Sequence, residues 1–140
     1  MKQLEQARIF LGKARQDEVA VNELKGSSSV ADEIVGFHCQ QAAEKLLKAL
    51  LSVLKVRVRK THDLQELIDL AASAETPLPE DLEAVAAFNP YAAAFRYDFL
   101  PPGMALDREA ALELLIRLRQ WVEHRIPDDP QQNGPRPAAC

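Results

Sequence analysis

The chain has 140 residues, of which 47% are hydrophobic and only 6% aromatic, and its formal net charge is −4. This length fits a single domain with a hydrophobic core. The net negative charge argues against a protein that coats nucleic acid through an overall positive surface. Cys39 and Cys140 have no partner at metal-ligand spacing, which argues against a zinc site or a disulfide framework.

Residues 1–18 are charged throughout and lack the apolar stretch of a signal peptide. No run approaches the roughly 20 apolar residues that a membrane span requires. With two reduced thiols, these features predict a cytoplasmic protein that has no contact with a membrane. No metal or cofactor is expected.

The first helix is expected from Lys2 to Lys25, with Gly26 ending it. Phe10 widens an apolar stripe at helical spacing that consists of Leu4, Ala7, Leu11 and Ala14. Ser29, with Asp32 three residues later, is typical of the start of the next helix.

The second helix is expected from about Val30 to Leu54 and is apolar over a broad arc. That arc holds Val35, Cys39, Ala42, Ala43, Leu46, Ala49, Leu50, Val53 and Leu54. The opposite stripe holds His38, Gln41, Lys45, Lys48 and Ser52. A helix so widely apolar packs against more than one neighbour, as in a bundle.

Residues 55–60 (KVRVRK) form a short basic segment. The alternation of valine with basic residues could mark a strand, but a single strand would have no partner, so we expect a loop. Thr61 is expected to cap a third helix, with Asp63 in its first turn, where the helix dipole favours an anion.

A fourth helix is expected to begin at Pro79 and to break at Asn89-Pro90. A short helical turn, residues 91–96, follows it. Asp107 is expected to cap the last long helix, which ends before Pro127.

Four long helices and a short one, joined by short loops, predict an all-α fold: an antiparallel up-and-down four-helix bundle with an additional short helix. We expect this bundle to be one domain that spans residues 1–126. Residues 127–140 are polar and rich in proline, which predicts a disordered tail.

The polar stripe of the second helix has two interpretations. Any surface helix presents such a face to solvent, and Glu44 with Lys48 makes an ordinary ion pair at i, i+4. The stripe also carries amides and an imidazole, which can contact a base edge or a phosphate. On this second interpretation His38, Gln41 and Lys45 are ligand-binding candidates.

The basic segment would attract phosphates if it lay beside that stripe, although a solvated loop explains it equally. His62 lies at a helix start, where capping is the alternative to a functional role. Arg96 lies between Phe95 and Tyr97, and its planar guanidinium suits a phosphate or a carboxylate. A structural ion pair with Asp98 is the alternative for Arg96.

Arg119 and His124 lie five residues apart near the end of the last helix, and five residues turn a helix by about 500°. The two side chains would then lie about 140° apart and would not share a face unless the helix ends between them. A basic helix C-terminus, which the dipole favours, explains them equally well.

Several segments together resemble the HEPN domain family of small helical proteins. Residues 37–51 (FHCQQAAEKLLKALL) resemble its signature helix, and Thr61-His-Asp-Leu64 resembles the start of its next helix. Residues 91–97, which end in Phe-Arg-Tyr, resemble the segment before its final helix. The resemblance covers roughly residues 2–126 and implies a helical bundle that is often a homodimer.

The resemblance also implies a link to nucleotides or RNA. Many members act with a minimal nucleotidyltransferase as a toxin–antitoxin pair, and others are metal-independent ribonucleases in which a histidine follows an arginine by four to six residues. Here Arg96 has no such histidine, because residues 97–103 contain none. We expect the RxxxxH string of Arg119 and His124 to be accidental.

Two hypotheses follow. The first is a non-catalytic HEPN module that binds a nucleotide or RNA, or docks a nucleotidyltransferase, through His38, Gln41, Lys45, His62, Arg96 and Tyr97. The second is an endoribonuclease toxin that uses Arg119 and His124. A helical adaptor without a ligand is a third possibility.

Overall fold

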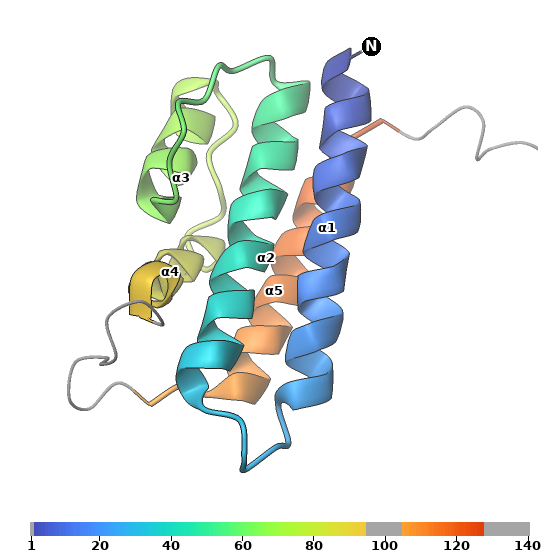
Figure 1. The fold of residues 1–140 in the computed structure, drawn as a ribbon. Helices are drawn as coiled ribbons and strands as arrows, with labels where there is room; N and C mark the ends of the chain where they lie inside the picture. The colour runs from blue at the N-terminus through green and yellow to red at the C-terminus, as the bar shows by residue number, and fades with distance from the viewer. Residues whose placement is uncertain (1, 95–104, 128–140) are drawn as a thin grey trace, which may run out of the picture.

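A computed structural model describes residues 2–94 and 105–127 and contains only helices and connecting segments over these ranges (Figure 1). The helices are α1 (Lys2–Leu24), α2 (Asp32–Val53), α3 (Leu64–Ser73), the 3₁₀-helix η1 (Leu82–Phe88), α4 (Tyr91–Ala94) and α5 (Arg108–Glu123). Helix α1 runs from top to bottom in Figure 1, whereas α2, α3 and α5 run from bottom to top, so α1 is antiparallel to both α2 and α5. The expected all-α helical bundle is confirmed.

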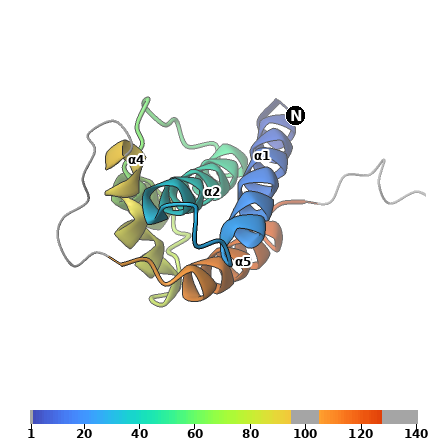
Figure 2. The same cartoon turned by 60° about the horizontal axis from the view of Figure 1, so that its bottom comes forward.

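Helix α2 is the central element of the bundle. It contacts α1, α3, α4, η1 and α5, and α1 and α4 lie on opposite sides of it (Figure 2). Its broad apolar arc explains this position, because Val35, Cys39, Leu46 and Leu50 are almost completely buried. The packing of a helix against several neighbours follows directly from such an arc.

Residues 82–88 differ from the expected fourth α-helix, because they form a 3₁₀-helix. Leu82, Val85 and Phe88 are its buried residues. A spacing of three places side chains on one face of a 3₁₀-helix, which has three residues per turn. Pro90 lies two residues past the end of η1, so the helix stays short.

The starts of the helices depend on polar contacts. Asp63, rather than Thr61, is the N-cap of α3 and accepts a hydrogen bond from Gln65 N. Asp107 is the N-cap of α5, as expected, and accepts a hydrogen bond from Ala110 N. Helix α2 begins at Asp32 without a side-chain cap, so the expected role of Ser29 as its cap is wrong.

One feature of the expected chain lies outside the described residues. The tail expected over residues 127–140 lies there except for Pro127. In the part that is described, no helix is both long enough and apolar enough to cross a membrane.

Candidate functional site

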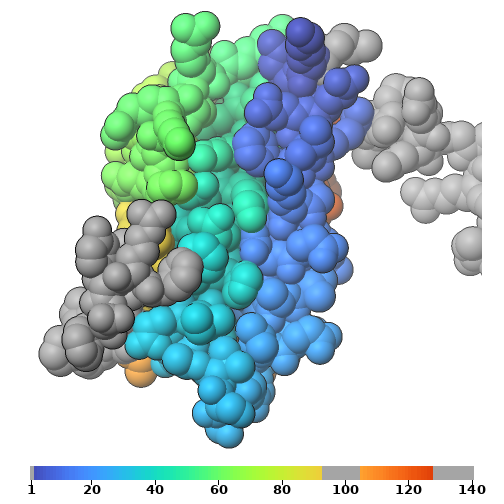
Figure 3. Space-filling model, in the orientation of Figure 1, coloured from blue at the N-terminus to red at the C-terminus, as the bar shows by residue number. Residues whose placement is uncertain are grey.

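The polar stripe of α2, which consists of His38, Gln41, Lys45, Lys48 and Ser52, is partly open to water. All five residues are half-buried. The surface of α2 remains visible between α1 and α3 along this side of the molecule (Figure 3). The stripe is therefore neither a fully solvated back nor part of the hydrophobic core.

His38 and Lys45 share a partner on the neighbouring helix. Lys45 Nζ lies 2.6 Å from Asp17 Oδ2, and His38 Nδ1 lies 3.0 Å from Asp17 Oδ1. The two residues are seven apart on α2, so they lie on the same face, and Asp17 of α1 bridges them. This arrangement fastens α1 to α2 and leaves 23% of the Lys45 side chain exposed.

Glu44 is the centre of a second group of polar contacts. Its carboxylate accepts hydrogen bonds from Gln40 Nε2 at 3.0 Å, His62 Nδ1 at 2.8 Å and Lys48 Nζ at 3.0 Å. Burial alone would raise the pKa of Glu44, but these donors outweigh burial and hold its pKa below the ordinary value. Glu44 is therefore a buried anion that fixes three donors.

Gln40 and Gln41 complete this group. Gln40 is fully buried, and its amide also donates to His62 O at 3.1 Å. Gln41 Nε2 donates to Gln40 Oε1 at 2.7 Å. Gln41 thus positions the buried amide of Gln40, which in turn holds the chain at the start of α3.

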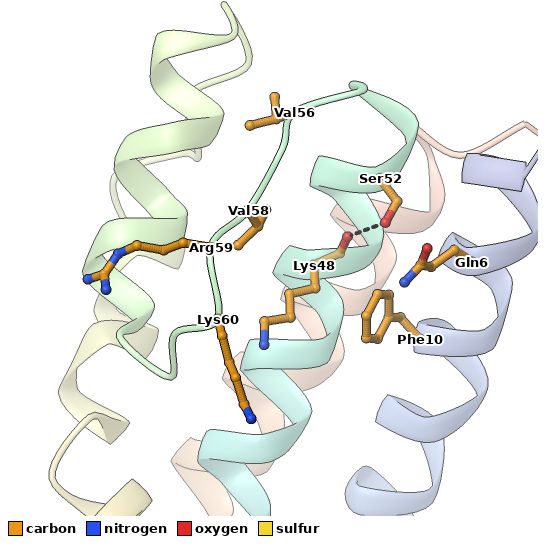
Figure 4. A pocket seen from close by; sticks show the side chains of 8 residues that line it. All are labelled: Gln6, Phe10, Lys48, Ser52, Val56, Val58, Arg59 and Lys60. Carbon is orange, nitrogen blue, oxygen red and sulfur yellow. Dashed lines mark hydrogen bonds between the residues drawn. The ribbon is translucent and has the colours of Figure 1, made fainter.

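The basic segment, residues 55–60, folds back beside α2. Val56 and Val58 pack against the core, whereas Lys55, Arg57, Arg59 and Lys60 are exposed. The alternation of valine with basic residues therefore reflects a loop that has one side packed on the core and the other exposed, and not a strand. Lys60 then lies beside α2 on the side of Lys48, whereas the Arg59 side chain extends over α3 (Figure 4).

A pocket of about 310 Å³ lies where α1, α2 and this segment meet (Figure 4). We call it the basic pocket. Its lining residues are Gln6, Phe10, Lys48, Ser52, Val56, Val58, Arg59 and Lys60. The lining includes three basic residues, an aromatic ring, a hydroxyl group and an amide, although the guanidinium of Arg59 extends away from the pocket over α3 (Figure 4).

The three cations differ in how far their charge is already compensated. Lys48 pairs with Glu44, and Arg59 pairs with Glu66 at 2.8 Å. Lys60 makes no ion pair within residues 2–94 and 105–127. Its side chain runs alongside α2, whereas Arg59 reaches away over α3 (Figure 4). Lys60 therefore provides the most available positive charge of the pocket.

Arg119 of α5 is held by carboxylates. Its Nε lies 2.9 Å from Oε2 of the buried Glu18, and its Nη1 lies 2.8 Å from Glu123 Oε1. These carboxylates raise the pKa of Arg119 although burial opposes the shift. His124 is exposed at the C-cap of α5. Arg119 thus joins α5 to α1, on a different part of the molecule from the basic pocket.

The remaining candidates divide into two groups. Arg96 and Tyr97 lie outside the described residues. Among the pocket residues, Arg59 and Lys60 belong to the candidate basic segment, whereas nothing in the sequence pointed to Gln6 and Phe10. The basic composition of residues 55–60 was the available signal, but only the fold places that segment against α1 and α2.

Little else in the described part of the chain suggests bond-making chemistry. Burial raises the pKa of the Cys39 thiol to about 12, which keeps it protonated and unreactive at neutral pH. Among residues 2–94 and 105–127 no cluster of His, Cys, Asp or Glu side chains could hold a metal ion. The described polar groups instead suit the binding of an anion.

Comparison with known proteins assigns the chain to a family. The model of the HEPN domain matches residues 2–125. The crystal structure of an archaeal HEPN homologue shares the fold, with a TM-score of 0.65 at 22% sequence identity, over 86% of this chain and 98% of that chain. No curated protein matches the sequence. The family match covers most of the chain, and the chain therefore belongs to the HEPN domain family.

Proposed function

We propose that this HEPN protein is a binding module for nucleotides or RNA. The observation that carries the proposal is the position of the basic segment, whose Arg59 and Lys60 line one pocket with Lys48 and Ser52 of the α2 stripe. The chain as a whole has a net charge of −4, so this pocket is a local concentration of positive charge on an acidic protein. A local basic site attracts phosphates without general affinity for nucleic acid.

A titration of the purified protein with ATP, GTP and single-stranded RNA tests this function. We expect saturable binding of at least one of these ligands, and binding that weakens as the salt concentration rises, because the contacts are ionic. An absence of saturable binding for all three ligands would refute the proposal.

We further propose that the protein acts with a minimal nucleotidyltransferase as a toxin–antitoxin-type pair and that it forms a homodimer. Family membership supports both ideas, and the exposed apolar residues Ile9 and Val19 of α1 support the second. Co-expression with a nucleotidyltransferase encoded beside it, followed by affinity purification, should recover both chains. Light scattering should give twice the chain mass of 15.6 kDa; a monomer would contradict the dimer.

The alternative of a metal-independent endoribonuclease has no comparable support. Such an enzyme needs a cation for the phosphate and a base near the 2′-hydroxyl group. The cation of the RxxxxH string, Arg119, is already paired with Glu18 and Glu123. We therefore favour binding over cleavage.

A further inference from the structure

We propose that the basic pocket accepts a single phosphate group attached to a nucleoside, and that it does not select for a polyphosphate. The inference rests on the proposed function and specifies its ligand. The phosphate can belong to a nucleoside monophosphate or to one unit of a single-stranded RNA. Both sources present one phosphate beside a ribose and a base, and the experiment below distinguishes them.

The charges around the pocket set the number of phosphates. Two of its cations, Lys48 and Arg59, already have carboxylate partners, Glu44 and Glu66. Lys60 makes no ion pair with any described residue. The three basic residues and the two carboxylates that pair with them therefore leave about one unit of uncompensated positive charge at the pocket. One phosphodiester or monoester balances that charge, whereas the further phosphates of ATP would find no other unpaired cation in the described lining of the pocket.

The ion pair between Glu44 and Lys48 is expected to remain intact when a phosphate binds. Glu44 is only 5% exposed and holds Gln40 and His62 as well as Lys48. Removing Lys48 from Glu44 would leave a buried carboxylate with less compensation, which is unfavourable. Lys48 is thus expected to contact the phosphate while it remains bound to Glu44, through another of its three N–H donors.

The uncharged lining residues match the rest of a nucleotide. Phe10 supplies an aromatic ring, and stacking of a base on such a ring tolerates any base. Gln6 is exposed and offers an amide that can bond to a phosphate or a ribose hydroxyl group. A volume of about 310 Å³ is at the lower end of the range for ligand pockets, which suits one nucleotide unit.

Three ligands test the proposal by calorimetry or fluorescence anisotropy: AMP, ATP and a short single-stranded RNA. We expect AMP and ATP to bind with affinities within about tenfold of each other, since the additional phosphates remain in screening solvent. A preference of ATP over AMP greater than that would overturn the proposal. Binding of AMP identifies a free nucleotide as a sufficient ligand, and binding of RNA alone identifies a strand; either outcome supports the single-phosphate site.

Two matched variants place the ligand in the pocket. Lys60→Gln keeps most of the side chain and removes its charge, and we expect it to weaken binding by about tenfold. Lys55→Gln makes the same change in the same segment but outside the pocket lining, and it should leave affinity almost unchanged. With RNA, Lys60→Gln should also reduce the slope of log affinity against log salt by about 0.7.

Phe10→Leu tests the aromatic contact, because leucine retains apolar packing but lacks a ring face. We expect affinity to fall about fivefold or more, while Phe10→Tyr should bind as the wild type does. Thermal unfolding of each variant controls for loss of fold. If wild-type protein binds a ligand but Lys60→Gln and Lys55→Gln behave alike, the pocket inference is wrong and the proposed function stands. If the wild-type protein binds none of the ligands, both fail.

Discussion

Gly36 shows how closely single residues are packed around α2. A Cβ atom at this position would overlap the ring of Tyr91, which is only 3% exposed. We expect Gly36→Ala to lower the free energy of unfolding by about 1–3 kcal/mol, because the buried ring and α4 must shift to make room. Urea denaturation measures this change.

Gly12→Ala is the matched control for that substitution. Gly12 also lies within a helix, but a Cβ there would meet nothing within 4 Å. Alanine has the higher helix propensity, so we expect a gain in stability of about 0.5–1 kcal/mol. If Gly36→Ala were equally stabilising, the close packing of Tyr91 on α2 would be disproved.

Arg119 is expected to matter for stability, and His124 is not. Arg119→Ala would remove one of the two arginines that pair with the buried Glu18, Arg15 being the other. We expect a loss of about 1–3 kcal/mol in the free energy of unfolding. His124→Ala, at an exposed position, should change it by no more than about 0.5 kcal/mol.

This difference also gives the ribonuclease alternative a clean test. Since Arg119→Ala is expected to perturb the fold, cleavage should be compared between wild type and His124→Ala, with RNA and EDTA present. We expect no cleavage that depends on His124. Metal-independent cleavage by the wild type that is abolished in His124→Ala would make the protein an enzyme.

Glu44 makes the stability of the protein depend on pH in a defined direction. Its pKa in the folded state is below the ordinary value of 4.5. The folded protein therefore favours the carboxylate, and this stabilisation is complete above pH 4.5 and is lost as the pH falls through the folded pKa. We expect Glu44→Gln to be less stable than the wild type at pH 7, with the difference shrinking below pH 4.5.

Denaturant unfolding at a series of pH values from 7 to 3 measures this difference. Asp17→Asn is a suitable comparison, because Asp17 also accepts bonds from two α2 residues, His38 and Lys45. A difference between wild type and Glu44→Gln that is the same at every pH would show that the Glu44 carboxylate is not specifically stabilised in the folded protein.

At the scale of elements, Arg108 holds together the connection that joins α1 to α2. Its guanidinium donates hydrogen bonds to Leu24 O at 2.9 Å, Ser27 O at 2.7 Å and Val30 O at 2.6 Å. It also donates to Asp32 Oδ1 at 3.0 Å. One side chain at the start of α5 thereby satisfies carbonyls near the end of α1 and along the connection to α2.

We expect Arg108→Lys to lower the free energy of unfolding by about 2 kcal/mol or more, because a single ammonium group cannot bond to all of these carbonyl and carboxylate oxygens at once. Arg117→Lys is the control. Among the described residues Arg117 pairs only with the exposed Asp81, so this substitution should change stability by less than about 1 kcal/mol. Equal effects of the two substitutions would show that the contacts of Arg108 are not important for the fold.

The elements themselves followed from the sequence where a local signal exists. Apolar spacing located α1 and α2, Thr61 and Asp63 indicated where α3 starts, and Asp107 marked the start of α5. The α2 start was less predictable, because Ser29 offered a plausible cap, while Arg108, 76 residues from Asp32, actually organises that turn. Residues 82–88 carried the spacing of a 3₁₀-helix, which a search for α-helical periodicity overlooks.

At the scale of the whole molecule, the candidate site was predictable only in part. The sequence identified the α2 stripe and the basic segment separately. The spacing of four predicted the pair of Glu44 with Lys48, but the sequence could not show that Asp17 engages His38 and Lys45, or that Glu44 engages His62. Such pairings depend on how α1 and the segment before α3 pack on α2, and no local pattern encodes that packing.

The same packing determines which part of the surface carries uncompensated positive charge. Lys48 and Lys60 lie together at the basic pocket, whereas Arg119 pairs with Glu18 where α5 meets α1. Two surfaces that both looked basic in the sequence thus differ in available charge. An anion is expected at the first surface and not at the second.

A titration of isotope-labelled protein with AMP or a short single-stranded RNA, followed by backbone amide chemical shifts in NMR spectra, tests this expectation most directly. We predict that the largest shifts cluster at Phe10, Lys48, Ser52 and residues 58–60, with little change at residues 119–125. Shifts concentrated at Arg119 and His124, or no shifts at saturating ligand concentrations, would contradict the assignment of the basic pocket.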